Sequence, residues 1–124
     1  MQVTRASEGE TVERDAAIFE HGPVWARSLV AVGASEDFSV GVVHFPPGAR
    51  AGWHRHSSDQ VLYVVNGIGK VGDDEGEHVI SAGDCVIIPA GTDHWHGAHD
   101  TGSPMSHLTI TRANSETTVT RREG

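Results

Sequence analysis

The sequence has only one cysteine, Cys85, and no long hydrophobic run. A single cysteine excludes an intrachain disulfide, so packing, with or without a metal ion, has to hold the fold together. Because this cysteine lies in an apolar run, we expect a small buried side chain without chemistry. No apolar stretch approaches the roughly 20 residues of a membrane-spanning helix. The N-terminal residues contain no apolar signal-peptide core, so membrane insertion is not expected and the cytoplasm is the default location.

Positive charge is also scarce, with nine Lys and Arg residues against 17 Asp and Glu residues and a formal net charge of −8. Such an acidic chain repels nucleic-acid phosphates, which argues against nucleic-acid binding. The 124 residues fit one domain with a modest core. Histidine is the residue type in excess, with nine copies, and it is the commonest metal ligand and the usual proton carrier at neutral pH.

Glycine and proline divide the chain into short runs rich in Val, Ile, Thr and aromatic residues, without a helical period. This spacing is typical of an all-β antiparallel sandwich or barrel. Asn66-Gly67 lies between two apolar runs and predicts a hairpin. We expect an N-terminal arm at residues 1–17, a barrel at residues 18–114 and a C-terminal tail at residues 115–124. The expected strands are 24–32, 38–45, 61–65, 78–80, 86–88 and 105–111.

Two pairs of closely spaced histidines indicate a metal site. His54 and His56 are two residues apart, so on a strand both imidazoles project from the same face and can converge on one ion. Gln60 follows at the start of the next strand, where its amide oxygen could supply a third ligand. His94 and His96 form the second pair, directly after a Pro-x-Gly turn that would aim His94 back into the barrel.

These two clusters resemble the conserved motifs of a known family. Residues 48–67 resemble the first cupin motif, G-x5-H-x-H-x3-E-x6-G, with glutamine at the position of the usual glutamate. Residues 83–96 resemble the second motif, G-x5-P-x-G-x2-H. The resemblance implies a double-stranded β-helix, the jelly-roll barrel of RmlC-like proteins. It also implies one divalent metal ion held by the side chains at four motif positions, which are His54, His56, Gln60 and His94.

Glutamine at position 60 changes the expected metal chemistry. A glutamate would cancel one unit of the ion's charge, whereas an amide cancels none. The ion therefore binds more weakly but polarises a bound oxygen more strongly, which favours Lewis-acid catalysis over structural metal binding. Imidazole and amide ligands suit Mn, Fe, Co, Ni or Zn. The resemblance to manganese-dependent cupins favours Mn among these ions.

Two further histidines, His96 and His107, are the expected catalytic residues. Strand alternation lets both side chains project into the cavity beside the metal. Together with the glutamine-bearing first motif, their surroundings resemble the manganese-dependent bacterial hydroxynitrile lyases and the cupins allied to carboxymuconolactone decarboxylases. In those lyases the two matching histidines lie in the active site. For isolated histidines such as His78 we expect a structural or solvated role.

The resemblance implies an enzyme whose metal acts as a Lewis acid on a small aldehyde or cyanohydrin, with reversible cleavage of a carbon–carbon bond. Three alternatives stay open: a non-haem metal dioxygenase, a polyketide cyclase or isomerase, and a non-catalytic small-molecule-binding cupin. The side chains expected to line the substrate pocket are Val42, Leu62, Val64, Ile88 and Trp95.

The expected partners are a small-molecule substrate and further copies of the same chain. Barrels of this size commonly bury an outer sheet face against a second copy, so we expect a homodimer or a higher homo-oligomer. The outward residues Val61, Tyr63 and Val65 form the expected contact patch, together with the N-terminal arm.

Overall fold

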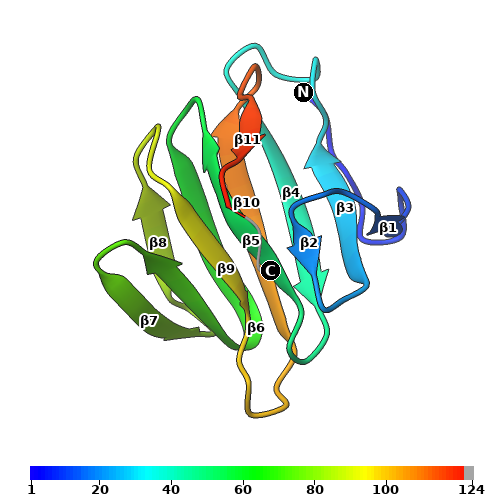
Figure 1. Ribbon diagram of the computed structural model, residues 1–124. Coiled ribbons are helices and arrows are strands. Elements are labelled where there is room, and N and C mark those ends of the chain that lie inside the picture. Colours follow the sequence, from blue (N-terminus) through cyan, green and yellow to red (C-terminus); the bar gives the residue numbers. More distant parts are fainter. Residues whose placement is uncertain (122–124) are drawn as a thin grey trace.

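The computed structural model describes residues 1–121, which contain strands and no helix and curve into a nearly closed barrel (Figure 1). The all-β prediction is confirmed. In this part of the chain no helix has the length and apolar character to cross a membrane. The strands are β1 (Val12–Arg14), β2 (Phe19–Glu20), β3 (Val24–Val30), β4 (Phe38–Phe45), β5 (Arg50–His56), β6 (Gln60–Asp73), β7 (Gly76–Ser81), β8 (Cys85–Ile88), β9 (His94–Ala98), β10 (Met105–Arg112) and β11 (Thr117–Val119).

The strands form two antiparallel sheets that share the long strand β6. The first sheet has the order β1-β3-β4-β10-β6-β8. In the second sheet β6 lies between β7 and β9, β9 pairs with β5, and both β2 and β11 add to β5. Figure 1 shows the two sheets facing each other, with β6 crossing from one to the other.

The core lies between the two sheets and follows the two-residue period of the strands. Along β6, Leu62 and Val64 point inward and are fully buried, whereas Tyr63 points outward and is 42% exposed. Phe45 and Met105 meet the inward side chains from β4 and β10. Although the sequence of β6 is apolar at successive positions, only one face of the strand is buried in the core.

Shortening one core side chain is expected to have a modest effect on stability. Ile80 on β7 is 5% exposed and packs in the core, so Ile80→Val should lower the free energy of unfolding by about 1 kcal/mol. Urea unfolding of the purified protein measures this loss. Its neighbour Val79 is 60% exposed, and Val79→Ala should change stability by less than about 0.5 kcal/mol. Equal losses in both variants would contradict the assignment of Ile80 to the core.

The hairpin predicted at Asn66-Gly67 is wrong, because β6 runs without a break through both residues. The register shifts at this point, where Ser106 pairs with Asn66 but His107 pairs with Val64. Gly67 has φ +79°, and a Cβ at this position would lie 1.9 Å from the carbonyl oxygen of Pro104. Glycine is therefore required for a bulge that turns β6 from the first sheet into the second.

Both terminal segments contribute strands to the barrel. Within the predicted arm, β1 pairs with β3 of the same chain. Within the predicted tail, β11 pairs with β5, while Arg122 to Gly124 lie outside the described residues. Three-residue strands are too short to show a period in the sequence, which is why neither pairing was predicted.

The outer face of the first sheet carries exposed apolar side chains. Of the predicted contact patch, Tyr63 and Val65 are each 42% exposed and Val61 is half-buried. Cys85 pairs with Tyr63 at this face and is exposed, so the expectation of a buried cysteine is wrong. Alternation in β8 buries Ile88 and half-buries Val86, and it turns Cys85 to the solvent side. The homo-oligomer stays a prediction.

Candidate metal centre

The structure brings together the three histidines that were predicted to meet. His54 and His56 come from β5, and His94 begins β9, directly opposite His54 in the antiparallel ladder. One ring nitrogen from each of the three lies within 4.8 Å of the other two. His54 and His94 are buried and His56 is half-buried. The three imidazoles could therefore hold a metal ion.

Hydrogen bonds to the backbone determine which ring nitrogen of His54 and of His94 carries the proton and which can bind a metal. His54 Nδ1 donates to the carbonyl oxygen of Gly52 at 2.5 Å, and His94 Nδ1 donates to the carbonyl oxygen of Thr92 at 2.8 Å. A carbonyl oxygen can only accept, so the proton of each neutral ring is on Nδ1. The Nε2 atoms of His54 and His94 are then unprotonated lone-pair donors, which is the form that binds a metal.

Gln60, at the start of β6, turns its amide oxygen toward this cluster. Its Nε2 group donates to the hydroxyl of Thr109 at 2.8 Å, and its Oε1 atom lies 3.2 Å from His94 Nε2. With the proton of His94 on Nδ1, two electron-rich acceptors face each other at this distance. A cation that binds both atoms removes the repulsion between them.

His56 supplies a second observation that fits a bound cation. Its Nε2 atom is buried and has no hydrogen-bond partner among residues 1–121, although buried polar atoms are normally satisfied. The donor set of three imidazole nitrogens and one amide oxygen therefore fits a divalent transition metal.

Burial keeps the three imidazoles neutral. Desolvation is the main cause that lowers the pKa of His54 and His56 to about 4, and the nearby His94 lowers both further. Desolvation also lowers the pKa of His94. Protons therefore compete little for these nitrogens at neutral pH.

His96 and His107 form a second pair of buried imidazoles beside the first cluster. His107 Nδ1 donates to the carbonyl oxygen of Leu108 at 3.1 Å, so its Nε2 atom accepts from His96 Nδ1 at 3.2 Å. His96 Nε2 is left as a buried lone pair, with no hydrogen-bond partner in the described part of the chain. The His96 ring centroid lies 5.4 Å from that of His54 and 5.7 Å from that of His94.

The environment of this pair is apolar. Phe45 contacts the His96 ring edge-on at 5.8 Å and the His107 ring at 5.4 Å between centroids. Burial lowers the pKa of His107 to about 4 and that of His96 well below its ordinary value, and the positive charge of neighbouring histidines lowers the pKa of His96 further. At neutral pH His96 is thus an unprotonated base held in one orientation.

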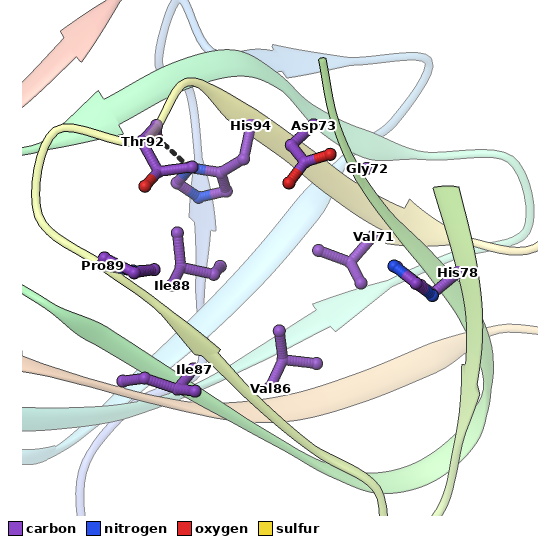
Figure 2. Close-up of a pocket in the computed structure, with 10 residues that line it drawn as sticks. All are labelled: Val71, Gly72, Asp73, His78, Val86, Ile87, Ile88, Pro89, Thr92 and His94. Atoms are coloured by element: carbon purple, nitrogen blue, oxygen red, sulfur yellow. Dashed lines mark hydrogen bonds between the residues drawn. The ribbon is translucent and has the colours of Figure 1, made fainter. Parts of the chain in front are cut away.

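A cavity of about 160 Å³ lies between His94 and residues of β6, β7 and β8 (Figure 2). Its walls combine apolar side chains with a few polar groups. Figure 2 shows Asp73 beside the His94 ring and the His78 imidazole directed at Val71. The lining residues are Val71, Gly72, Asp73, His78, Val86, Ile87, Ile88, Pro89, Thr92 and His94.

Of the five predicted pocket residues, only Ile88 is among the residues that line this cavity. Leu62 and Val64 are fully buried within the packed core. Val42 lies on the opposite face of β4 from Val43, which packs on the core, and Trp95 lies under the guanidinium of Arg50 at 5.0 Å. Because His94 and His96 point inward, alternation turns Trp95 outward.

Sequence reasoning missed the cavity residues of the hairpin β6–β7. Val71 pairs with both His96 and His78, so the three side chains share the inner face of the second sheet. Asp73 lies two residues further along β6 and therefore also points inward. The two-residue alternation along each strand could have indicated that these side chains point inward. It can be used only when the register of β6 with β7 and β9 is known.

Comparisons with known proteins agree with this architecture. The sequence profile of the Cupin domain family matches residues 41–111. The (R)-mandelonitrile lyase of Granulicella tundricola is 44% identical over 69 residues, which cover 55% of this chain and 52% of the lyase. The chain thus spans about half the length of that relative.

Two solved structures extend the likeness to the whole barrel. A cupin-like protein from Thermotoga maritima superposes with a TM-score of 0.81 at 28% identity, covering 97% of this chain and 92% of the other. The polyketide cyclase RemF from Streptomyces resistomycificus superposes with a TM-score of 0.85 at 14% identity, covering 99% and 87%, and shows the fold alone. The family match includes more than half of the residues and all four candidate ligands, and the chain therefore belongs to the cupin domain family.

Proposed function

We propose that this cupin is a metal-dependent lyase that cleaves and forms the carbon–carbon bond of a small cyanohydrin. One observation carries the proposal: a buried imidazole with a free Nε2 atom, His96, adjoins a cluster of histidines that could hold a metal ion. Cleavage of a cyanohydrin requires a base that removes the hydroxyl proton and a Lewis acid that stabilises the negative charge on the oxygen. His96 and the neighbouring cluster could supply these two functions.

The groups that would hold the ion are His54, His56, Gln60 and His94. Mn is the favoured metal, and Fe, Zn, Ni or Co suit the same donors. When bound, such an ion supplies Lewis-acid stabilisation of negative charge on the substrate oxygen. Gln60 contributes no charge of its own, and its amide is oriented by the 2.8 Å hydrogen bond to Thr109.

The proton path follows from the hydrogen bonds of the second histidine pair. His96 Nε2 takes the proton of the cyanohydrin hydroxyl, while His96 Nδ1 keeps its proton and donates to His107 Nε2. Cleavage of the bond between the carbinol carbon and the nitrile carbon leaves an aldehyde and cyanide. Cyanide then takes the proton from His96 Nε2 and departs as hydrogen cyanide, which restores the neutral base.

Similarity to a curated enzyme supports the reaction class. The 44% identity to the (R)-mandelonitrile lyase extends over 69 residues, about the length of the family match. The cavity supports a small substrate with an apolar group, since Val71, Val86 and Ile88 line a space of about 160 Å³.

The test combines metal analysis with turnover of mandelonitrile. The purified protein is expected to contain a divalent metal, to release benzaldehyde in proportion to metal content, to lose this activity on chelation and to regain it with Mn. A His54→Ala variant should lose both metal and activity. Full metal loading without turnover would contradict the proposal. Oxygen uptake that requires Fe would indicate a dioxygenase instead, and ligand binding that survives chelation would indicate a non-catalytic binding protein.

A further inference from the structure

The last strand of the described chain lies directly against the strand that carries two candidate ligands. In the antiparallel pairing of β11 with β5, Thr117 is opposite His56, Thr118 is opposite Arg55 and Val119 is opposite His54. Figure 1 shows β11 in red, and in the strand order it follows β5 at the end of the second sheet. The C-terminal strand is therefore in a position to influence the metal centre.

Thr117 makes the contact that links this strand to the cluster. Its hydroxyl oxygen lies 2.9 Å from His56 Nδ1. The corresponding Nδ1 atoms of His54 and His94 are satisfied locally, by backbone carbonyls two residues earlier in the chain. The Nδ1 partner of His56 instead comes from 61 residues away, so its ring orientation depends on the docking of β11.

Several contacts fix β11 in this position. At its beginning, Glu116 and Ser57 exchange two hydrogen bonds, of 2.8 and 2.9 Å. At its end, the backbone N–H of Thr120 donates to the carbonyl oxygen of Trp53 at 3.1 Å. The contacted residues lie directly beside His54 and His56, so both ends of β11 are attached close to these ligands.

Arg121 extends the attachment to the third candidate ligand. Its guanidinium lies 3.9 Å from the centroid of the Trp53 ring and 3.0 Å from the carboxylate of Asp93. Thr120 also donates a hydrogen bond to Asp93, and Arg121 pairs with Asp74 at the tip of the β6–β7 hairpin. Since Asp93 immediately precedes His94, the C-terminal segment connects the two strands that supply the histidines.

We propose that Thr117 is a positioning residue of the metal centre. Its hydroxyl accepts the Nδ1 proton of His56, which keeps His56 Nε2 unprotonated and directed at the ion. This inference rests on the proposed metal site. Hydrogen-bond partners of this kind are worth about 10- to 100-fold in metal affinity. Because Thr117 is exposed and water can replace part of its hydrogen bond, we expect the lower end of that range.

The test compares three substitutions in the full chain. Thr117→Val keeps the shape and the β-branch but removes the hydroxyl, and it is expected to bind Zn²⁺ about 10-fold more weakly than wild type in a competition titration with a chromophoric chelator. Thr117→Ser retains the hydroxyl and should restore the affinity. Thr118→Val makes the same chemical change on the opposite face of β11 and should bind as wild type does.

A second readout is independent of the metal. In the metal-free protein, ¹⁵N NMR of the His56 ring should show the Nδ1-protonated tautomer in wild type and a loss of that preference in Thr117→Val. Equal Zn²⁺ affinity and an unchanged tautomer in Thr117→Val would overturn the role of Thr117 and leave the metal site intact. Failure of the wild-type protein to bind any metal would overturn both the proposed function and this inference.

Discussion

A His96→Asn variant is expected to lose about 10²- to 10⁴-fold in kcat/KM for cyanohydrin cleavage while it retains its metal. The amide nitrogen of asparagine occupies roughly the position of Nδ1 and can still donate to His107 Nε2. The Nε2 atom, which is buried and has no hydrogen-bond partner in the described chain, is deleted. The substitution therefore removes the proposed base and keeps the hydrogen bond that satisfies its neighbour.

The matched control is His99→Asn. His99 follows β9, and its ring contacts Thr101 rather than the buried cluster, so kcat/KM should stay close to that of wild type. Metal content and the circular dichroism spectrum of both variants need to match wild type for the comparison to hold. Near-normal turnover by a fully loaded His96→Asn enzyme would exclude His96 as the base.

The metal-free protein is expected to lose stability as the pH falls from 6.5 toward 4. Burial lowers the pKa of His54, His56 and His107 from 6.5 to about 4 in the folded state, so in this window the unfolded chain binds more protons than the folded one. Folding is then disfavoured increasingly as the pH decreases. For the enclosed His107 alone, the loss amounts to about 2 kcal/mol at about pH 5.

Urea unfolding of the chelator-treated protein at about pH 7 and about pH 5 measures this loss, above the range in which most carboxylates titrate. A His107→Leu variant removes one of the buried imidazoles whose pKa is lowered by folding and should lose less stability over the same interval. The same free energy of unfolding at both pH values would mean that the unfolded chain binds no more protons than the folded one, contrary to the buried neutral imidazoles described above.

The sequence predicted those features that depend on a period of two or on local turn residues. His54 and His56 share a face because they are two residues apart on β5, and the Pro-x-Gly turn before His94 brings this ring toward them. The strand Phe38–Phe45 was predicted with its observed bounds, because charged or proline-containing segments flank an apolar run.

Features that depend on register or on pairing between distant segments could not be predicted. Asn66-Gly67 is a hairpin signal in most contexts, yet here β6 runs on through both residues to Asp73 and its register with β10 shifts, so a bulge replaces the turn. Trp95 is among the residues expected in the pocket, but it lies between two inward histidines on β9, and strand alternation turns it outward. Thr117 could not be connected with His56, because no local pattern links residues 61 positions apart.

The pairing of strand β6 limits how far the candidate ligands can move in the metal-free protein. Its first half is paired with β8 and β10 and its second half with β7 and β9, so neither half can detach without breaking two ladders at once. Gln60 begins this strand and Val71 lies in its second half, so the amide ligand and one wall of the cavity lie on a segment whose double pairing opposes local opening. Binding of an ion would then require little ordering of the backbone, and the entropy lost on capture would be small.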